Sequence, residues 1–259
     1  MEPVLATRNL VKRFGGLLAT DDVTLSLPPG ARHALIGPNG AGKTTFVNLL
    51  TGVLRPTSGR ITLAGEDVTA WPIHRRAKAG LARTFQINQL FTDFTPLETI
   101  GLVLSERRGE GARFWSRVGT DRAVVDHAVA TLSSLGLGDV MERRVGSLAY
   151  GKQRLLEIAV AVAQEPKVLL LDEPAAGVPE GERDQILDVV DALPASMCVV
   201  LIEHDMDLVF RFARTISVLV QGGLLVEGPA AQIAADPRVR KVYLGEGFDG
   251  SAIPSAAHG

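Results

Sequence analysis

The chain has 259 residues, of which 46% are hydrophobic and 22% charged, and it carries 27 Lys and Arg residues against 29 Asp and Glu residues. This much apolar material can form a core, which excludes intrinsic disorder for most of the chain. A net charge of −2 disfavours a protein that coats nucleic acid, so no nucleic-acid partner is expected. The single cysteine, Cys198, cannot form an intramolecular disulfide and is expected to be a small buried hydrophobic residue.

The sequence predicts neither a signal peptide nor a membrane span. Residues 1–6 lack a basic region followed by an apolar stretch. Apolar runs such as 155–163 are short or contain a charge, and none approaches the ~18 uncharged residues that cross a bilayer. We therefore expect a cytoplasmic protein, unless a partner holds it at a membrane.

In chain order, short apolar strands alternate with longer amphipathic segments, which predicts an α/β fold with a largely parallel sheet. Residues 23–27 and 60–63 alternate polar and apolar side chains, a pattern typical of half-exposed antiparallel strands. Residues 31–36, 168–171 and 199–202 are nearly continuous apolar runs, as expected of strands covered on both faces.

The middle of the chain has a different pattern. From 96 to 164 most segments space their apolar residues for a helix face, for example at 126–132 and 155–160. We interpret this region as a helical subdomain inserted in the α/β core. The residues after 246 are rich in Gly, Ser and Ala, and the sequence predicts a flexible tail over 247–259.

The sharpest motif follows the strand that ends at Ile36, and it matches the phosphate-binding pattern G-x-x-x-x-G-K-[ST] in full. It reads Gly37-Pro38-Asn39-Gly40-Ala41-Gly42-Lys43-Thr44-Thr45. Glycines let the backbone N–H groups approach an anion, and the N-terminus of the following helix adds partial positive charge. We expect Lys43 to reach the β- and γ-phosphates of ATP and Thr44 to offer its hydroxyl to Mg²⁺.

Polar residues at the ends of two other predicted strands supply the remaining chemistry. Asp172 closes a buried strand, where Mg²⁺ or its waters would compensate its charge, and Glu173 is the candidate base for the attacking water. His204 follows the next strand and could hydrogen-bond the γ-phosphate, because parallel strands bring their carboxyl ends to one edge. A structural histidine is the alternative for His204.

With these motifs, the chain from about 4 to 245 resembles the ATP-binding subunits of ABC transporters. The resemblance implies a P-loop (RecA-like) core at 1–91 and 165–246 with an antiparallel β subdomain, and a helical subdomain at about 92–164. It also implies that Gln86 contacts Mg²⁺ and water and that Phe14 stacks on adenine. Residues Leu148-Ala149-Tyr150-Gly151 occupy the place of the family's signature motif, L-S-G-G.

Two positions depart from the family pattern. Ala149 replaces the signature serine, whose hydroxyl would bond the γ-phosphate across a dimer, and Pro179 replaces the usual D-loop aspartate. The same departures narrow the subfamily, because the motifs of this chain, Leu148 to Gly151 included, are similar to those of branched-chain amino acid importers of the LivG type. Lipopolysaccharide-export ATPases share the ending at 243–246 and are the nearest alternative. A soluble ABC ATPase without a transport role is a rival from another class, although it usually has two nucleotide domains or a coiled-coil insertion.

The resemblance implies that this chain works with separate proteins. They are membrane permease subunits, a second ABC ATPase that is either another copy or a sister chain, and a solute-binding protein outside the membrane. It places the chain peripherally on the inner face of the cell membrane. Branched-chain amino acids are the expected solutes, with urea or amides as alternatives.

Two aromatic residues between arginines, Phe114 and Trp115, stand out in the predicted helical subdomain. A helix face packed on its own domain is the ordinary interpretation of such residues. Aromatic side chains flanked by Arg also suit a membrane interface, so the sharper hypothesis places Phe114 and Trp115 on the side of the permease or the lipid headgroups.

Overall fold

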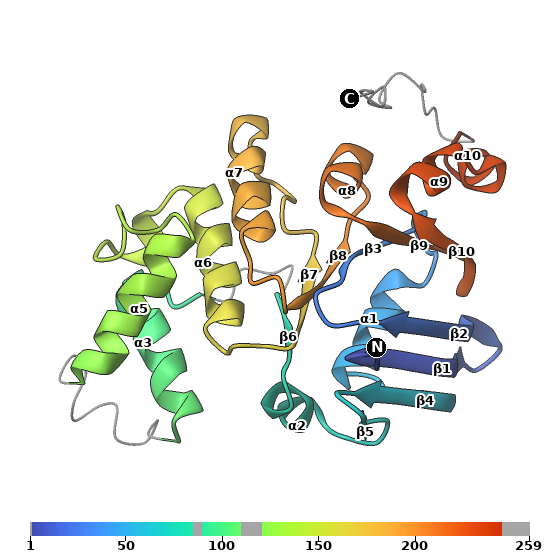
Figure 1. Cartoon of the computed structure of the whole chain (residues 1–259), viewed down its shortest axis with the longest axis horizontal. Helices are drawn as coiled ribbons and strands as arrows, with labels where there is room; N and C mark the ends of the chain where they lie inside the picture. Colours follow the sequence, from blue (N-terminus) through green and yellow to red (C-terminus); the bar gives the residue numbers. More distant parts are fainter. Residues whose placement is uncertain (1, 85–89, 110–120, 245–259) are drawn as a thin grey trace. The chain divides into compact units, whose positions relative to one another are not determined.

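The computed structural model describes residues 2–84, 90–109 and 121–244, and Figure 1 shows its strands and helices. The chain divides into two compact units, Met1–Ile73 with Val200–Gly259 and His74–Val199. Both contain strands and helices, which confirms the predicted α/β class. Within the described ranges, no helix combines the length and the apolar character needed to cross a membrane.

An antiparallel sheet forms one part of the first unit, where its strands lie side by side in Figure 1. Its order is β2-β1-β4-β5, with β1 at Leu5–Phe14, β2 at Leu17–Leu27, β4 at Ser58–Leu63 and β5 at Glu66–Asp67. The predicted strands at 23–27 and 60–63 lie in β2 and β4, and both pair with β1. Alternate residues of β2, among them Val23, Leu25 and Leu27, are buried, so the sheet has one core face.

The rest of the first unit contains the strands that position the phosphate loop. Four neighbouring strands have the order β10-β9-β3-β8, and β8 crosses the boundary between the units. They are β3 (Arg32–Ile36), β8 (Cys198–Ile202), β9 (Thr215–Val220) and β10 (Gly223–Pro229), with helices α1 (Lys43–Thr51), α8 (Met206–Phe212), α9 (Ala230–Ala235) and α10 (Pro237–Leu244). Strand β3 is parallel to β9. Every residue of β3 and β8 is buried, including Cys198, as the sequence predicts.

The second unit combines two parallel strands, β6 and β7, with a group of helices. Its elements are α2 (Ile73–Lys78), β6 (Leu81–Arg83), α3 (Pro96–Arg107), α5 (Arg122–Ser134), a 3-10 turn η2 (Val145–Ser147), α6 (Tyr150–Val162), β7 (Val168–Asp172) and α7 (Glu180–Asp191). Helix α3 packs against α5 and α6, and α6 packs against α7. The segments predicted as helical at 126–132 and 155–160 lie in α5 and α6.

Helix α3 begins at a capping box. The Thr95 hydroxyl accepts a hydrogen bond from the Glu98 N–H at 3.1 Å, and the Glu98 carboxylate accepts one from the Thr95 N–H at 2.8 Å. Pro96 stands at the first helical position, where a missing N–H costs nothing. These residues fix the start of the helix by local interactions alone.

Candidate functional site

The phosphate loop connects a buried strand to a helix within the first unit, as the sequence predicts. Strand β3 ends at Ile36, and α1 begins at Lys43. The N-cap residue of α1 is Gly42, which has no side chain to bond the first N–H groups of the helix. The first N–H groups of a helix have no acceptor within the helix itself, and they favour an anion at this position.

Two glycines of the loop lie where no side chain fits. A Cβ at Gly37 would overlap the carbonyl oxygen of Leu219 and would lie 2.9 Å from the Ala41 Cβ. Gly42 has a φ of +97°, and a Cβ there would lie 2.6 Å from the carbonyl oxygen of Ala19. The loop therefore keeps a bare backbone against its neighbours, as a phosphate cradle requires.

Lys43 holds its ammonium group against the loop. Its Nζ donates to the carbonyl oxygens of Gly37 and Pro38, the latter at 3.1 Å. Thr44, the next residue of the predicted site, is exposed to solvent at the first turn of α1. A cation and a hydroxyl thus stand side by side in sequence at the positive end of a helix, which is the arrangement that a polyphosphate with Mg²⁺ needs.

Phe14 is an exposed aromatic residue at the end of β1 in the same unit. Its side chain is 45% exposed, and the Lys12 ammonium lies over its ring, 4.9 Å from the centroid. Lys12 also donates to the carbonyl oxygen of Arg55 at 2.8 Å, which fixes the cation there. An exposed ring is suited to stacking on a base, and adenine stacking on Phe14 stays a prediction.

His204 and Glu203 follow strand β8, the neighbour of β3. The Glu203 carboxylate is buried and accepts a hydrogen bond from the His204 N–H at 3.1 Å. The imidazole of His204 is 65% exposed, with its Nδ1 3.8 Å from a Glu203 carboxylate oxygen. The structure thus presents the imidazole to solvent, next to the buried carboxylate of Glu203.

Asp172 ends strand β7 in the second unit, where its carboxylate pairs with an arginine. One carboxylate oxygen accepts a hydrogen bond from Arg83 Nη2 at 2.5 Å, and the two side chains are only 10% and 11% exposed. The Thr84 hydroxyl accepts a bond from the Asp172 N–H at 3.2 Å. Arg83 therefore compensates part of the charge of this carboxylate, and the role of Asp172 as a Mg²⁺ ligand stays a prediction.

Glu173 adopts an unusual backbone conformation directly after Asp172. Its φ is +46°, in the left-handed region that residues other than glycine rarely occupy. The Glu173 carbonyl oxygen accepts a hydrogen bond from the Ala176 N–H at 3.1 Å, which closes a turn at this point. Strain of this kind persists only where surrounding contacts hold it, and it is common at catalytic positions.

The signature segment forms the start of helix α6, also in the second unit. Ala149 is the N-cap residue and forms no side-chain cap bond, and Tyr150 is the first helical residue. Gln153 Nε2 donates to the carbonyl oxygen of Leu148 at 2.9 Å, which ties the segment to the first turn. The loss of the serine hydroxyl thus leaves the helix start with backbone donors only.

The remaining predicted residues either form no side-chain hydrogen bond at a helix start or lie outside the described residues. Pro179 is the N-cap residue of α7 and contributes no side-chain cap bond. Gln86, Phe114 and Trp115 lie outside the described residues, as does the predicted tail at 247–259. In the parts of the chain that the structure covers, no group of three or more His, Cys, Asp or Glu residues could hold a metal ion.

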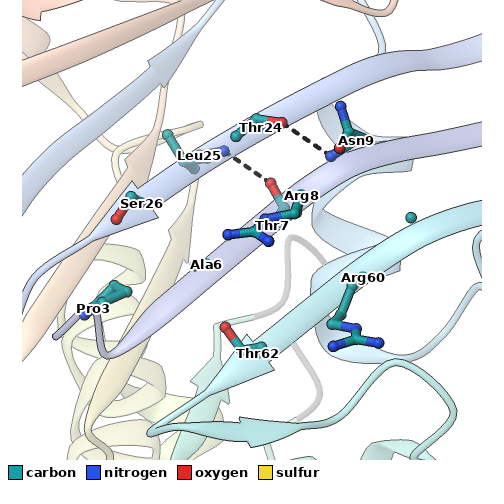
Figure 2. A pocket seen from close by; sticks show the side chains of 11 residues that line it. Pro3, Ala6, Thr7, Arg8, Asn9, Thr24, Leu25, Ser26, Arg60 and Thr62 are labelled. Atoms are coloured by element: carbon teal, nitrogen blue, oxygen red, sulfur yellow. Dashed lines mark hydrogen bonds between the residues drawn. The ribbon is translucent and has the colours of Figure 1, made fainter.

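A pocket of about 710 Å³ lies on the antiparallel sheet, and Figure 2 shows its lining side chains on β1, β2 and β4. Arg8, Asn9, Thr24 and Arg60 contribute polar groups to its wall. Hydrogen bonds between β1 and β2 cross its floor, from the Asn9 N–H to the Thr24 hydroxyl and from the Leu25 N–H to the Thr7 hydroxyl. None of the predicted site residues lines this pocket, so it is distinct from the phosphate loop.

Comparison with known proteins identifies the family. Residues 20–176 match the model of the ABC transporter family, and residues 224–249 match that of the branched-chain amino acid ATP-binding cassette transporters. The chain is 40% identical to the high-affinity branched-chain amino acid transport ATP-binding protein BraF of Pseudomonas aeruginosa, over 94% of this chain and 98% of that protein. It is 39% identical to the corresponding protein LivG of Escherichia coli, over 95% and 99% of the two chains.

Solved structures agree with this result. An ATP-binding cassette of an ABC transporter in its ADP conformation superposes with a TM-score of 0.83, at 31% identity over 95% of this chain and all of that chain. A nucleotide-free cassette superposes with a TM-score of 0.81, at 32% identity over the same shares of the two chains. The chain therefore belongs to the ATP-binding cassettes of ABC transporters, and it is an ATPase.

Proposed function

We propose that this ATPase powers the uptake of branched-chain amino acids through a separate membrane permease. The observation that carries the proposal is the near-complete match to relatives named for that transport, together with a second family match at 224–249 in the C-terminal part of the chain. The match disfavours the lipopolysaccharide-export and non-transport alternatives. Permease subunits and a solute-binding protein would complete the system, with this chain on the inner face of the membrane.

Nucleotide binding is assigned to the first unit. The loop from Gly37 to Thr45 binds the phosphates through its backbone N–H groups, Lys43 neutralises the β- and γ-phosphates, and Phe14 stacks on the adenine. Mg²⁺, when bound, neutralises charge on the phosphates as they react. The residues that would hold it are Thr44, Gln86 and Asp172, whose hydroxyl, amide and carboxylate oxygens are the donors that Mg²⁺ prefers.

Hydrolysis requires a base and a group that senses the γ-phosphate. Glu173 is proposed to accept a proton from the attacking water at a carboxylate oxygen, and Gln86 to orient that water. His204 is proposed to donate from its imidazole to a γ-phosphate oxygen. The left-handed backbone at Glu173 and the exposed imidazole of His204 support these assignments.

The signature segment is proposed to act on a second ATPase subunit, either another copy or a sister chain. Residues Leu148 to Gly151 would contact the γ-phosphate bound by the facing subunit. Ala149 offers no hydroxyl, so the backbone N–H groups and the dipole of α6 supply this contact. The helical subdomain, proposed at about 92–164 between core segments 1–91 and 165–246, would pass the closing motion to the permease.

Reconstitution tests the proposal. The chain is assembled with its permease and solute-binding protein in vesicles, and ATP turnover is measured with leucine, isoleucine or valine and, separately, with urea or acetamide. We expect stimulation by the branched-chain amino acids. Stimulation by urea or acetamide alone would assign another solute, and turnover without any permease-dependent stimulation would contradict the transport role.

The variant Glu173→Gln tests the assignment of the base. Because an amide cannot accept the proton from water, we expect turnover to fall by about 10²- to 10⁴-fold while nucleotide binding is retained. Glu180→Gln, which removes an exposed carboxylate at the first position of α7, is the matched control. Normal turnover in Glu173→Gln would reject Glu173 as the base.

A further inference from the structure

Tyr150 connects the signature segment to the turn that follows strand β7. Its hydroxyl donates to the carbonyl oxygen of Ala176 at 3.3 Å. Its ring lies against Gly177, where an added Cβ would be 3.3 to 3.5 Å from the phenol oxygen and the neighbouring ring carbons. Gly177 has a φ of +74°, so it is both bare and left-handed where the ring covers it. The side chain thus holds two consecutive residues of this turn.

The position of the ring is fixed from the helix side. The Arg154 guanidinium lies over the Tyr150 ring, 5.4 Å from its centroid. Arg154 is itself buried and forms a 2.7 Å ion pair with Glu157, one turn further along α6. The Tyr150 side chain, which is 39% exposed, thus contacts a guanidinium that a buried ion pair holds in place on α6.

A second contact joins the same two segments. Glu182, in the first turn of α7, lies so close to Gly151 that a Cβ on Gly151 would overlap its carboxylate. Gly151 is the second residue of α6 and Glu182 the third residue of α7. The start of the signature helix is therefore in contact with the chain on both sides of Pro179.

The turn held by Tyr150 leads directly to Glu173. The Ala176 N–H donates to the Glu173 carbonyl oxygen at 3.1 Å, while the Ala176 carbonyl oxygen accepts from the Tyr150 hydroxyl. The Tyr150 phenol is thus linked to Glu173, the proposed base, by two hydrogen bonds that the backbone of Ala176 forms. The backbone of that residue is left-handed, so its carboxylate direction depends on the contacts that hold the turn.

We propose that Tyr150 is a positioning residue that couples the two ATP sites of the dimer. The inference rests on the proposed function, in which the signature segment serves the ATP of the facing subunit and Glu173 serves the ATP of its own. When the facing γ-phosphate draws in the N-terminus of α6, Tyr150 moves with it and sets the Glu173 turn through Ala176. Tyr150 thereby couples the two ATP sites, which Ala149 and Pro179 cannot do because they have no polar side chains.

The test compares Tyr150→Phe with Tyr243→Phe in the full chain. Tyr150→Phe removes only the hydroxyl and keeps the ring over Gly177, and Tyr243→Phe removes the hydroxyl of the chain's other tyrosine. ATP hydrolysis is measured over a range of ATP concentrations, and the folded fraction is measured by thermal unfolding. For two coupled sites the wild-type Hill coefficient lies above one and has an upper limit of about two.

We expect Tyr150→Phe to lower the Hill coefficient toward one and kcat about two- to tenfold, with the ATP Kd unchanged, as the loss of one hydrogen bond allows. A role in stability alone would lower activity per mole without changing the Hill coefficient per folded molecule. A wild-type coefficient of one, or an equal coefficient in Tyr150→Phe, Tyr243→Phe and wild type, overturns the coupling role. Wild-type turnover that Glu173→Gln does not reduce would instead overturn the proposed function beneath it.

Discussion

His33 gives the chain a measurable pH dependence of stability. Its side chain is buried at the second residue of β3, and its Nε2 lies 2.9 Å from the Ser217 hydroxyl on β9. Ser217 donates its own hydrogen to a Glu227 carboxylate oxygen at 2.7 Å, so the His33 Nε2 carries the proton of this hydrogen bond. Burial lowers the pKa of His33 from 6.5 to about 4, because the charged imidazolium loses its hydration.

The pKa gives the size and sign of the effect. The folded state keeps His33 neutral down to pH about 4, whereas the unfolded chain takes up the proton below 6.5. Stability is therefore fully present above pH 6.5 and is lost as the pH falls toward 4. Each pKa unit is worth about 1.4 kcal/mol, so the free energy of unfolding falls by about 2 kcal/mol at pH 5 and by about 3 kcal/mol when the loss is complete.

The variant His33→Gln isolates this contribution, since every other titrating group is shared with the wild type. At pH 7.5 we expect the variant to be less stable by about 1 kcal/mol, if its amide replaces the imidazole hydrogen bond poorly. At pH 5 the wild type should have lost about 2 kcal/mol more than the variant, so the two stabilities should cross.

Urea unfolding of both proteins at pH 7.5 and 5 measures the difference, and an NMR titration of the His33 ring measures its pKa directly. Parallel stability curves for the two proteins, or a His33 pKa near 6.5 in the folded state, would refute the reasoning. A histidine that titrates normally would mean that water reaches the ring in spite of its burial.

Two further predictions concern single side chains. Arg83→Met should lower the free energy of unfolding by about 3–5 kcal/mol, because it leaves the buried Asp172 carboxylate unpaired. Adding Asp172→Asn should restore much of the loss in urea unfolding, and an unimproved double variant would argue that Arg83 acts by packing. Thr95→Ala should cost about 1 kcal/mol by removing the α3 capping box, whereas Thr95→Ser should cost little. Equal stabilities of the two Thr95 variants would show that the cap bond contributes nothing.

The parts of the fold that the sequence predicts are those specified by local pattern. Strands β3, β7 and β8 are continuous apolar runs, and the structure buries every residue in them. The phosphate loop is equally local, because its glycines, lysine and flanking elements are consecutive in the chain. Each of these features depends on neighbours within about ten residues, which is the range over which patterning is informative.

Strand β1 shows why other elements were missed. It lies between β2 and β4, yet its burial does not alternate regularly, since its pairing shifts register after Thr7, Leu10 and Lys12. Each shift moves the following side chains to the other face of the sheet, so the two-residue period disappears from the sequence. Strand β6, with three residues, is too short to show any period.

The partner of Asp172 could not be read from the sequence for a different reason. Arg83 lies 89 positions earlier, and its guanidinium reaches the carboxylate only because β6 pairs with β7 in the register that places Arg83 opposite Leu170. Patterning predicts that a buried carboxylate needs a partner, but it does not choose between a metal and a distant arginine. The contact with Arg83 depends on strand register, which is a property of the folded sheet.

Contacts between residues that are distant in sequence also change the interpretation of the signature segment. Taken one position at a time, Ala149 is a lost hydroxyl, and Tyr150 is only the residue that follows it in the segment Leu148 to Gly151. In the structure the tyrosine hydroxyl bonds the Ala176 carbonyl, 26 positions away, and its ring covers Gly177. A glycine at 150 could make neither contact, so in our proposal the segment that lacks a hydroxyl at Ala149 contributes the Tyr150 hydroxyl to the turn that leads to Glu173.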